Sequence, residues 1–467
     1  MIYLFFVIWL IIGAAAFWAP SRRIVHTVCL LYMASHAAFA ITLFAGGNYL
    51  QSSGAFFTFD EAGTLFYVLL AIVSSFVLIH SQEYLKEDKF VHYRKYFALL
   101  MLLITSITGV YFANNIAVTW ILLETTTLCS AGILYHRHSE QTLEATWKYL
   151  FVCSTGIAIA YLGILLLCAA ASNSSLDYNE LQHLIVNGNP LYLKIAFLLI
   201  LTGYSCKMEI FPLYTIGVDA NFAAPAPASA LISTGLVNAG FLAIFRIYRL
   251  FVHTAIFEWV QSVMLIIGFL SLMVGALFLR RTNNYKRFLS YSTVENMGIV
   301  AIGLGIGGIG VWAALFHIIC HTFIKSSLFL QIAVVRQIYN GYRINRIGDY
   351  ININKVGAIA LIAGMVVVLA FPPSPLFISE LMILWQSVES GSWLLLLAIV
   401  LLLCIVIYSV CQRIIKLCYQ HNQDELHLSN INRRLSYSAL ALLLMAIALG
   451  LWQPEPLKQI IYEIVTF

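Results

Sequence analysis

LYLKIAFLLILTGYSCKMEIFP, residues 191–212, is an apolar stretch that carries a lysine near its end and stops at a proline. A helix that crosses a bilayer needs roughly 20 predominantly apolar residues, and this stretch has that length. Lys207 is therefore expected inside the membrane, where an ionisable side chain costs roughly 3 kcal/mol and marks a functional site. Pro212 removes a backbone donor and ends the helix. The stretch predicts a broken membrane helix with a buried charge beside the break.

The rest of the chain has the same apolar character. Of its 467 residues 61% are hydrophobic and only 10% are charged, and the mean hydropathy is +0.88. A soluble domain of this length needs more charge to cover its surface. We therefore expect an all-α membrane protein, one membrane domain over 1–467, with about fourteen transmembrane helices. The predicted spans are 2–18, 24–44, 57–80, 96–113, 115–136, 142–171, 192–211, 226–250, 255–279, 296–310, 311–337, 354–388, 391–415 and 435–453.

Basic residues are distributed unevenly among the loops that join these spans. Nineteen of the 26 lysines and arginines follow odd-numbered spans, four follow even-numbered spans, and Lys148, Lys207 and Lys325 lie within spans. Cytoplasmic loops of membrane proteins carry the excess of basic residues. The pattern predicts a multi-pass protein with both termini on the outer side of its membrane. We expect that membrane to be the bacterial cytoplasmic (inner) membrane, so the termini are expected on the periplasmic side.

A second proline-rich stretch, Phe371-Pro372-Pro373-Ser374-Pro375, interrupts the twelfth span. Non-helical backbone at membrane depth persists only where protein buries it or where it lines a wet cavity. The two breaks lie five spans apart, which suits two inverted five-helix repeats, spans 4–8 (residues 96–250) and 9–13 (residues 255–415). Paired broken helices in inverted repeats mark ion sites in transporters. Two unrelated proline kinks are the alternative.

Several ionisable residues besides Lys207 lie within predicted spans. They are Glu124, Lys148, His317, His321, Lys325 and Glu380. The two histidines and Lys325 recur at every fourth residue, so they share one face of a helix. Carboxylates beside lysines, and histidines that titrate near neutral pH, can store and pass protons along a water-bridged chain. The pattern predicts a proton path.

Structural readings of the same residues remain open. A buried glutamate or lysine can form a static ion pair, and a buried histidine can be a hydrogen-bonded core residue. For Lys148 a structural role is nearly as well supported as a functional one, because Glu144 lies one turn before it and can pair with it at the membrane edge.

The sequence offers no catalytic or cofactor-binding motif of its own. Its nine cysteines form no CxxC pair, which argues against an iron–sulfur or zinc site. Neither a Walker lysine loop nor a GxGxxG motif before a helix is present. No cofactor, metal or nucleic-acid partner is expected, and whether the chain takes part in an enzymatic reaction depends on the complex that it serves.

Five segments carry a further pattern. They are EATWKYLFVCSTGIAIAYLG (144–163), AAPAPASALISTGLVNAGFLAIFR (223–246), YKRFLSYSTVENMGIVAIGLGIGG (285–308), HTFIKSSLFL (321–330) and FPPSPLFISEL (371–381). With the Lys207 region, they resemble the antiporter-like, proton-conducting subunits shared by respiratory complex I, Mrp sodium/proton antiporters and membrane-bound hydrogenases. WKYL, KRFLSYSTVENMG and Asn238 are most similar to the subunit-F type of hydrogenase-4.

The resemblance implies a two-part path. Glu124 matches the family's fifth-helix glutamate, and Lys207 matches the seventh-helix lysine that pairs with it. Lys325 matches the central lysine of the second half-channel. Glu380 matches the terminal residue of the twelfth helix.

A polar axis that joins the two parts is implied as well, and His317 and His321 would belong to it. Asn238 and Glu209 are expected to support it. Two of the departures from the family lie close to the first break. Glu209 stands where relatives usually have an apolar or small residue. Residues 214–220 read YTIGVDA, where relatives usually carry a histidine followed by Trp-Leu-Pro-Asp-Ala.

The chain is therefore interpreted as a proton-translocating subunit of a multisubunit membrane complex, most like the hydrogenase-4 or complex I type. Its expected partners are other membrane and peripheral subunits, the lipid bilayer and protons, with sodium ions as the alternative cargo. Two other functions stay open. One is the proton-conducting subunit of a two-component inorganic-carbon (bicarbonate) uptake system, and the other is a subunit of an Mrp-type Na+/H+ antiporter.

Overall fold

The computed structural model describes residues 2–45, 56–171, 175–419 and 434–466. These residues form helices joined by short connections, and their β-structure is limited to isolated bridges such as that between Phe57 and Ala113. The described chain has the all-α architecture that its composition predicts. Arg433, one of the basic residues counted in the charge alternation, lies outside the described residues.

The helices follow one another closely along the chain. Those of the first part are α1 (Ile2–Trp18), α2 (Arg22–Ala45), α3 (Glu61–Tyr84), α4 (Phe90–Phe112), α5 (Ile116–Leu134), α6 (Glu140–Ala171), α7 (Tyr178–Leu184), α8 (Pro190–Met208), α9 (Thr215–Ala223), α10 (Ala226–Leu231) and α11 (Val237–Leu250). Those of the second part are α12 (Phe257–Arg281), α13 (Tyr285–Ile306), α14 (Ile309–Tyr339), α15 (Tyr350–Ile353), α16 (Lys355–Val368), α17 (Pro375–Glu389), α18 (Trp393–Tyr419), α19 (Arg434–Leu451) and α20 (Glu455–Val465). The short turns are η2 (Tyr135–Arg137), η3 (Ile185–Asn187), η5 (Ile344–Arg346) and the π-turn η4 (Ile232–Leu236), which joins α10 to α11.

Eleven helical segments of the described chain are long and apolar enough to cross a membrane, and each coincides with a predicted span. The other three predicted spans differ from these. The first is the shorter apolar helix α1, and the twelfth is divided into α16 and α17. The tenth, predicted over 296–310, is wrong at its start because α13 begins at Tyr285. Its first turns hold Lys286 and Glu295, charged residues that resemble a loop in sequence but are buried in the fold.

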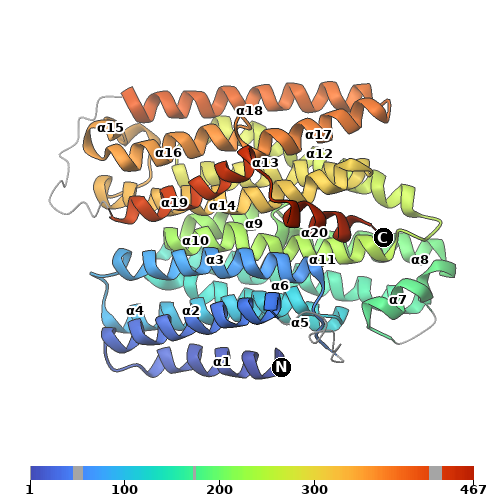
Figure 1. The fold of residues 1–467 in the computed structure, drawn as a ribbon, viewed down its shortest axis with the longest axis horizontal. Helices are drawn as coiled ribbons and strands as arrows, with labels where there is room; N and C mark the ends of the chain where they lie inside the picture. Colours follow the sequence, from blue (N-terminus) through green and yellow to red (C-terminus); the bar gives the residue numbers. More distant parts are fainter. Residues whose placement is uncertain (1, 46–55, 172–174, 420–433, 467) are drawn as a thin grey trace.

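The helices run roughly side by side, from α1 at one edge of the molecule to α18 at the other (Figure 1). α14 lies at the centre, where it packs against α13, α16, α17 and α19 and also against α3 and α10. Its apolar span is entirely buried within the chain. His317, His321 and Lys325 of α14 are therefore surrounded by protein and do not face lipid.

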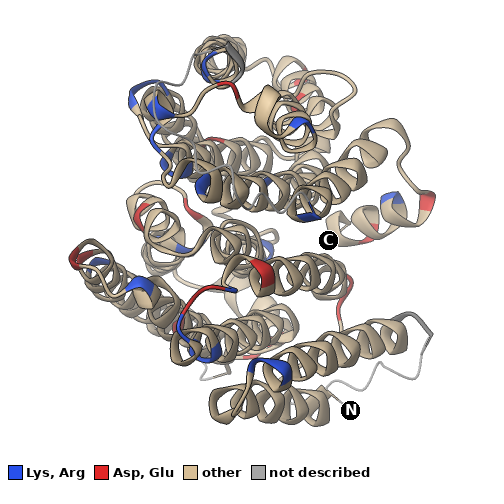
Figure 2. Ribbon diagram, turned by 90° about the vertical axis from the view of Figure 1, so that its left-hand side faces the viewer, with Lys and Arg blue, Asp and Glu red and all other residues tan. Residues whose placement is uncertain are grey.

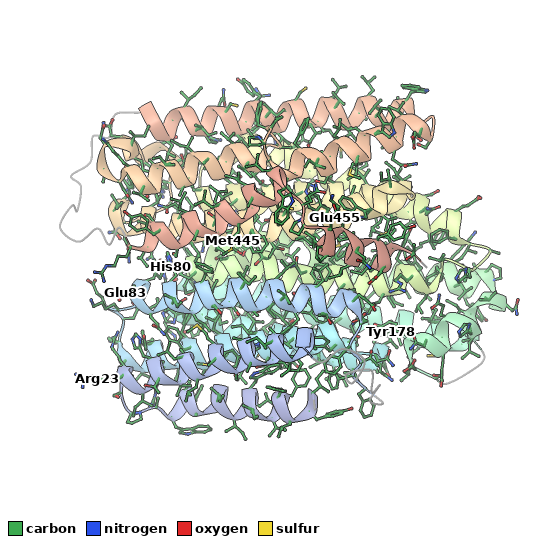
Figure 3. The ribbon with its side chains drawn as sticks, viewed as in Figure 1. Arg23, His80, Glu83, Tyr178, Met445 and Glu455 are labelled. Atoms are coloured by element: carbon green, nitrogen blue, oxygen red, sulfur yellow. The ribbon has the colours of Figure 1, made fainter. Side chains whose placement is uncertain are left out.

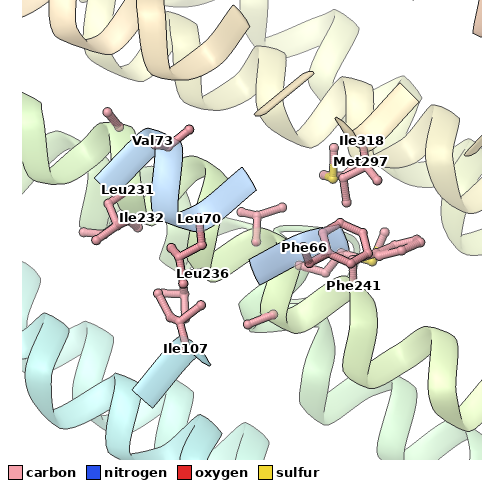
Figure 4. Packing of buried hydrophobic residues seen from close by; sticks show 14 of the residues in the cluster. Phe66, Leu70, Val73, Ile107, Leu231, Ile232, Leu236, Phe241, Met297 and Ile318 are labelled. Atoms are coloured by element: carbon pink, nitrogen blue, oxygen red, sulfur yellow. The ribbon is translucent and has the colours of Figure 1, made fainter. Parts of the chain in front are cut away.

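A continuous apolar core joins α3 to the segment α10–η4–α11. Leu70 of α3 lies beside Leu236 and Ile107, and Phe66 lies beside Phe241 (Figure 4). The rings of Phe66 and Phe241 have their centroids 5.7 Å apart. Because lipid tails are as apolar as leucine, such helix contacts depend on close packing more than on transfer from water.

The membrane helix is interrupted at both proline-rich positions. Pro212 lies between α8 and α9, and residues 371–375 separate α16 from α17. At the first break the N–H of Phe211 donates to Ser271 Oγ at 2.9 Å. At the second, Ser374 Oγ donates to the carbonyl of Val367 at 2.6 Å. Polar groups of the broken segments thus find partners inside the protein, as membrane depth requires.

The two ends of the helix array are distinct. Arg23 and Glu83 lie at one end and Tyr178 lies at the other (Figure 3). Seen from the end of Arg23 and Glu83, lysine and arginine positions recur along the loops and helix ends (Figure 2). The first residues of α1 and the helix α20 lie toward the opposite end (Figure 1). α20, which the span prediction does not include, packs against α3 and α14.

Candidate functional site

Lys207 occupies the last turn of α8, directly before the first break, and is 1% exposed. Its Nζ donates to Thr127 Oγ1 of α5 at 2.7 Å and to the hydroxyl of Tyr149 of α6 at 3.5 Å. The ring of Tyr149 also lies 5.4 Å from the ammonium. A cation is favoured at a helix C-terminus, where the last carbonyls have no helical partner. The position thus suits a buried lysine that donates to neutral oxygens.

Glu124 lies on the same face of α5 as Thr127, three residues before it, and is half-buried. Ser154 Oγ donates to Glu124 Oε1 at 2.6 Å, and Thr127 Oγ1 lies 3.3 Å from Oε2 and donates to it. The direct pairing of Glu124 with Lys207 that the resemblance implies is not made. The hydroxyl of Thr127 stands between the two charges and links them.

Close helix approach brings these groups together. A Cβ on Gly203 of α8 would lie 2.3 Å from the carbonyl oxygen of Gly156 of α6, so only glycine permits this contact. At the start of α5 the side chain of Asn115 accepts from the N–H of Ala117 at 2.9 Å and caps the helix. The first cluster, defined as Glu124, Thr127, Tyr149 and Lys207, is therefore fixed by α5, α6 and α8.

Lys148 is not brought into this cluster. It lies on an exposed face of α6, and its Nζ is 2.5 Å from Glu144 Oε1, with side chains 55% and 65% exposed. Its predicted place in a buried row is therefore wrong. The alternative that the sequence leaves open, a surface pair one helical turn apart, describes the contact.

Lys325 is the centre of a second group and is completely buried on α14. Its Nζ donates to the carbonyl of Leu289 of α13 at 2.9 Å. The carboxylates that act on its charge are those of Glu295 and Glu209. Among the described residues no carboxylate lies within 4.0 Å of this ammonium or of Lys207.

His317 connects α14 to the two helices beside it. Its Nδ1 lies 2.9 Å from Ser379 Oγ of α17, and its Nε2 lies 3.1 Å from Asn296 Oδ1 of α13. His321, one turn further along α14, is equally buried, and neither of its ring nitrogens has a hydrogen-bond partner. The three α14 residues share one face, as their spacing predicts.

Glu295 is a buried residue that the sequence interpretation missed. It is 2% exposed on α13 and accepts from Asn296 Nδ2 at 2.5 Å. The predicted span began one residue too late to include it. Asn284 was the available signal, because its side chain accepts from the N–H of Lys286 at 3.0 Å and caps α13. A helix that starts at such a cap places Glu295 inside the membrane.

Glu380 lies on the first turns of α17, just after the second break, and is half-buried. It shares with Glu295 a cavity of about 140 Å³, which Leu369 and Phe377 also line. The carboxylate of Glu295 acts electrostatically on that of Glu380. The second cluster, defined as Glu295, His317, His321, Lys325 and Glu380, therefore extends from α13 across α14 to α17.

Asn238 and Glu209 lie between the clusters. Asn238 Nδ2 of α11 donates to Thr322 Oγ1 of α14 at 2.9 Å. The π-turn η4 directly precedes α11, and such turns are frequent at functional sites. Glu209 follows Lys207 at the end of α8 and accepts from Asn221 Nδ2 of α9 at 2.9 Å.

The sequence interpretation also assigned Lys286 to a cytoplasmic loop, and the structure corrects this. Lys286 is completely buried in the first turn of α13, and its Nζ donates to the carbonyls of Phe222, at 3.2 Å, and Ala224. Arg287 Nη2 lies 3.0 Å from Asp219 Oδ1 of α9. These contacts hold α9, the segment after the first break, against α13.

Comparisons with known proteins identify the family of the chain. Residues 113–406 match the family described as NADH:quinone oxidoreductase/Mrp antiporter, TM. The Hydrogenase-4 component F homolog of Methylacidiphilum infernorum is 27% identical over 363 residues, which cover 74% of this chain and 76% of that protein. NADH-quinone oxidoreductase subunit N of Hydrogenovibrio crunogenus is 25% identical over 421 residues, which cover 87% and 86%.

Solved structures share the fold over nearly the whole chain. A chain of the membrane-bound sulfane sulfur reductase, an archaeal respiratory membrane complex, superposes with a TM-score of 0.86 at 20% identity and covers 99% of this chain and 96% of that chain. A chain of the Mrp complex from Dietzia sp. gives 0.85 at 17% identity with the same coverage. The chain belongs to the NADH:quinone oxidoreductase/Mrp antiporter family, the antiporter-like proton-translocating membrane subunits of complex I, Mrp and hydrogenase-type complexes.

Proposed function

We propose that the chain carries protons across the membrane through the first and second clusters in turn, as one subunit of a larger complex. The observation that carries this proposal is the state of the two central lysines. Lys207 and Lys325 are buried, and neither has a carboxylate within ion-pair distance in the described chain. A static buried ion pair needs close, well-oriented partners to repay desolvation. Lysines without such partners suit a role in which the side chain is protonated and deprotonated during transport.

The path we propose has an order that follows from the contacts. In the first cluster a proton passes between Glu124 and Lys207 through the hydroxyl of Thr127. In the second it passes between Lys325 and Glu380 by way of Glu295 and the α14 histidines. A hydroxyl can accept one proton and donate another, so Thr127 can serve both neighbours.

Protons fit the two clusters better than sodium ions do. Hard cations are bound by several oxygen ligands, such as carboxylates, carbonyls and water. Here ammonium groups stand at both centres, and His317 and His321 line the second, so the sites are built largely from groups that exchange protons. Sodium as the cargo is the less supported alternative.

We also propose a fourteen-helix topology with two inverted repeats, residues 96–250 and 255–415. It is supported by a break within each repeat, α8–α9 and α16–α17, and by an ionisable residue beside each break, Lys207 and Glu380. Residues 1–467 then form one membrane domain in the bacterial cytoplasmic membrane, with both termini outside.

The energy for transport must come from partner subunits. The chain shows no cofactor motif, and its relatives are named as a component or a subunit of larger assemblies. We propose other membrane and peripheral subunits as its partners. Purification of the native complex from membranes distinguishes the assemblies, because hydrogenase or quinone-module subunits, Mrp subunits or one large soluble partner would each identify a different system.

The test of this function is proton transport by the native complex in vesicles with an internal pH dye. Lys207→Ala is expected to abolish proton uptake while the complex stays assembled. Glu124→Ala is expected to do the same. Full proton transport by Lys207→Ala would refute the proposal.

A further inference from the structure

Glu209 is a buried carboxylate that neither cluster contains. It is 2% exposed and forms the C-cap of α8, where its φ is +58°. Glycine or asparagine usually occupies this left-handed position at a helix end. A charged residue held in a sparsely populated backbone conformation inside the protein points to a functional constraint.

The carboxylate of Glu209 is only half satisfied. Asn221 Nδ2 donates to Oε1 at 2.9 Å, but Oε2 has no hydrogen-bond partner, and neither has Asn221 Oδ1. A buried polar atom without a partner keeps the full cost of its desolvation. A purely structural cap would not require this free oxygen.

The fold makes room for this side chain. Gly217 of α9 packs directly on it, and a Cβ there would lie 2.3 Å from Glu209 Cγ and 2.6 Å from Oε1. Only glycine at 217 admits the glutamate in its observed position. Gly217 belongs to the stretch 214–220 that departs from the family pattern, and Glu209 is itself a departure from that pattern.

The end of α8 faces both clusters. Lys207 donates to Thr127 and Tyr149 of the first cluster. Two residues later, the carboxylate of Glu209 and the ammonium of Lys325 in the second cluster act on each other electrostatically. Asn238, the other polar residue between the clusters, bonds to Thr322 and has no proton that titrates.

We propose that Glu209 passes the proton between the first and second clusters. Its free Oε2 accepts a proton from the Lys207 side and gives it to the neutral amine of Lys325, and the carboxylate is then restored. The reverse order serves transport in the opposite direction. This assignment rests on the proposed function, and it makes the two residues at the end of α8 a single junction.

The decisive variant is Glu209→Gln in the native complex, because the amide keeps the size of the side chain and an acceptor for Asn221. We expect proton uptake into vesicles to fall at least tenfold with unchanged complex yield and thermal stability. Glu209→Asp, which keeps a titratable group, should retain more transport than Glu209→Gln. Glu144→Gln on the exposed face of α6 is the matched control and should transport at the rate of the unmodified complex.

The outcomes separate the two proposals. Glu209→Gln with more than half of the normal rate, beside an inactive Lys207→Ala, would overturn the junction and leave the proposed function intact. Normal transport by Lys207→Ala would instead overturn the proposed function.

Infrared difference spectra recorded across a pH titration give a readout that a structural cap would not affect. We expect a buried-carboxyl band that is missing in Glu209→Gln and altered in Lys325→Met, since Asn221 of α9 contacts Glu209 and Lys325 of α14 acts on it electrostatically. Should Glu209→Gln fail to accumulate, the comparison of the unmodified complex with Lys325→Met decides alone. A carboxyl spectrum insensitive to both pH and Lys325→Met contradicts the proposal.

Discussion

The two clusters place a buried lysine in different surroundings. Lys207 donates to two hydroxyls, and a third contact links it through Thr127 to the half-buried Glu124. Lys325 is as fully buried as Lys207 but donates to a single backbone carbonyl. Beside it stand His321, whose nitrogens have no partner, and the carboxylate of Glu295.

The two clusters differ in how well they stabilise the charged form of their lysine. In the first cluster neutral hydroxyls satisfy the ammonium, so the charged lysine is the well-supported form. In the second cluster few groups compensate the charge, and desolvation disfavours it. The first cluster is therefore suited to hold a proton and the second to release one.

The largest expected effect comes from replacing each lysine by arginine, which keeps the positive charge but does not lose its proton. If Lys325 must release a proton, Lys325→Arg should lower proton uptake about a hundredfold, which corresponds to roughly 2.7 kcal/mol of lost transition-state stabilisation. Lys207→Arg should lower it less, because the charged form is already the supported one. Uptake by the native complex in vesicles measures both.

Lys325→Met serves as the control for size and charge. It should accumulate normally, since an apolar residue of similar volume often replaces a buried ion without loss of stability. Equal activity of Lys325→Arg and the unmodified complex would show that only a static charge is needed there.

Next in size is Glu295→Gln, which removes a carboxylate from the second cluster but keeps an oxygen that can accept from Asn296. We expect a loss of about tenfold in transport, close to 1.4 kcal/mol. Glu380 shares the same cavity and remains as a carboxylate, so the loss should be smaller than for Lys325→Arg. Transport at the normal rate would exclude Glu295 from the path. The second cluster would then consist of the residues predicted from sequence, His317, His321, Lys325 and Glu380.

Most of the fold could be predicted because its signals are local. Long apolar runs and the prolines at 212, 372, 373 and 375 specify spans and breaks without knowledge of tertiary contacts. The start of α13 could not be predicted in this way. Lys286 resembles a loop residue in sequence. Its burial depends on tertiary hydrogen bonds to the carbonyls of Phe222 and Ala224, at the end of α9.

The residues of the site also differ in whether a local sequence signal reveals them. Lys207, Lys325 and the α14 histidines were found because a charge in a long apolar run is conspicuous. Glu295 was missed because its helix appeared to begin one residue after it. The bridging role of Thr127 has no sequence signal at all, since it depends on how α5, α6 and α8 meet.

A smaller effect is expected from Thr127→Val, which removes the hydroxyl between Glu124 and Lys207 but keeps the shape of the side chain. The lysine would lose its 2.7 Å acceptor. A hydrogen bond to a charged group is worth about 1.5–3 kcal/mol, so we expect transport to fall roughly tenfold and thermal stability to fall slightly. Thr127→Ser, which restores the hydroxyl, should recover transport. Failure of the serine variant to recover it would indicate a packing defect and not a broken proton link.

The smallest effect is expected at Lys148, an exposed lysine of α6 that lies outside both clusters. Lys148→Gln removes an exposed pair with Glu144, and exposed pairs one helical turn apart contribute little to stability. We therefore expect proton uptake and thermal stability to match those of the unmodified complex. Lys148 and Lys207 belong to helices that pack together, α6 and α8. A comparison of Lys148→Gln with Lys207→Arg therefore contrasts an exposed lysine with a buried one in the same part of the molecule. A tenfold loss of transport in Lys148→Gln, with normal complex assembly, would place the mouth of the path on the exposed face of α6 and extend the first cluster to it.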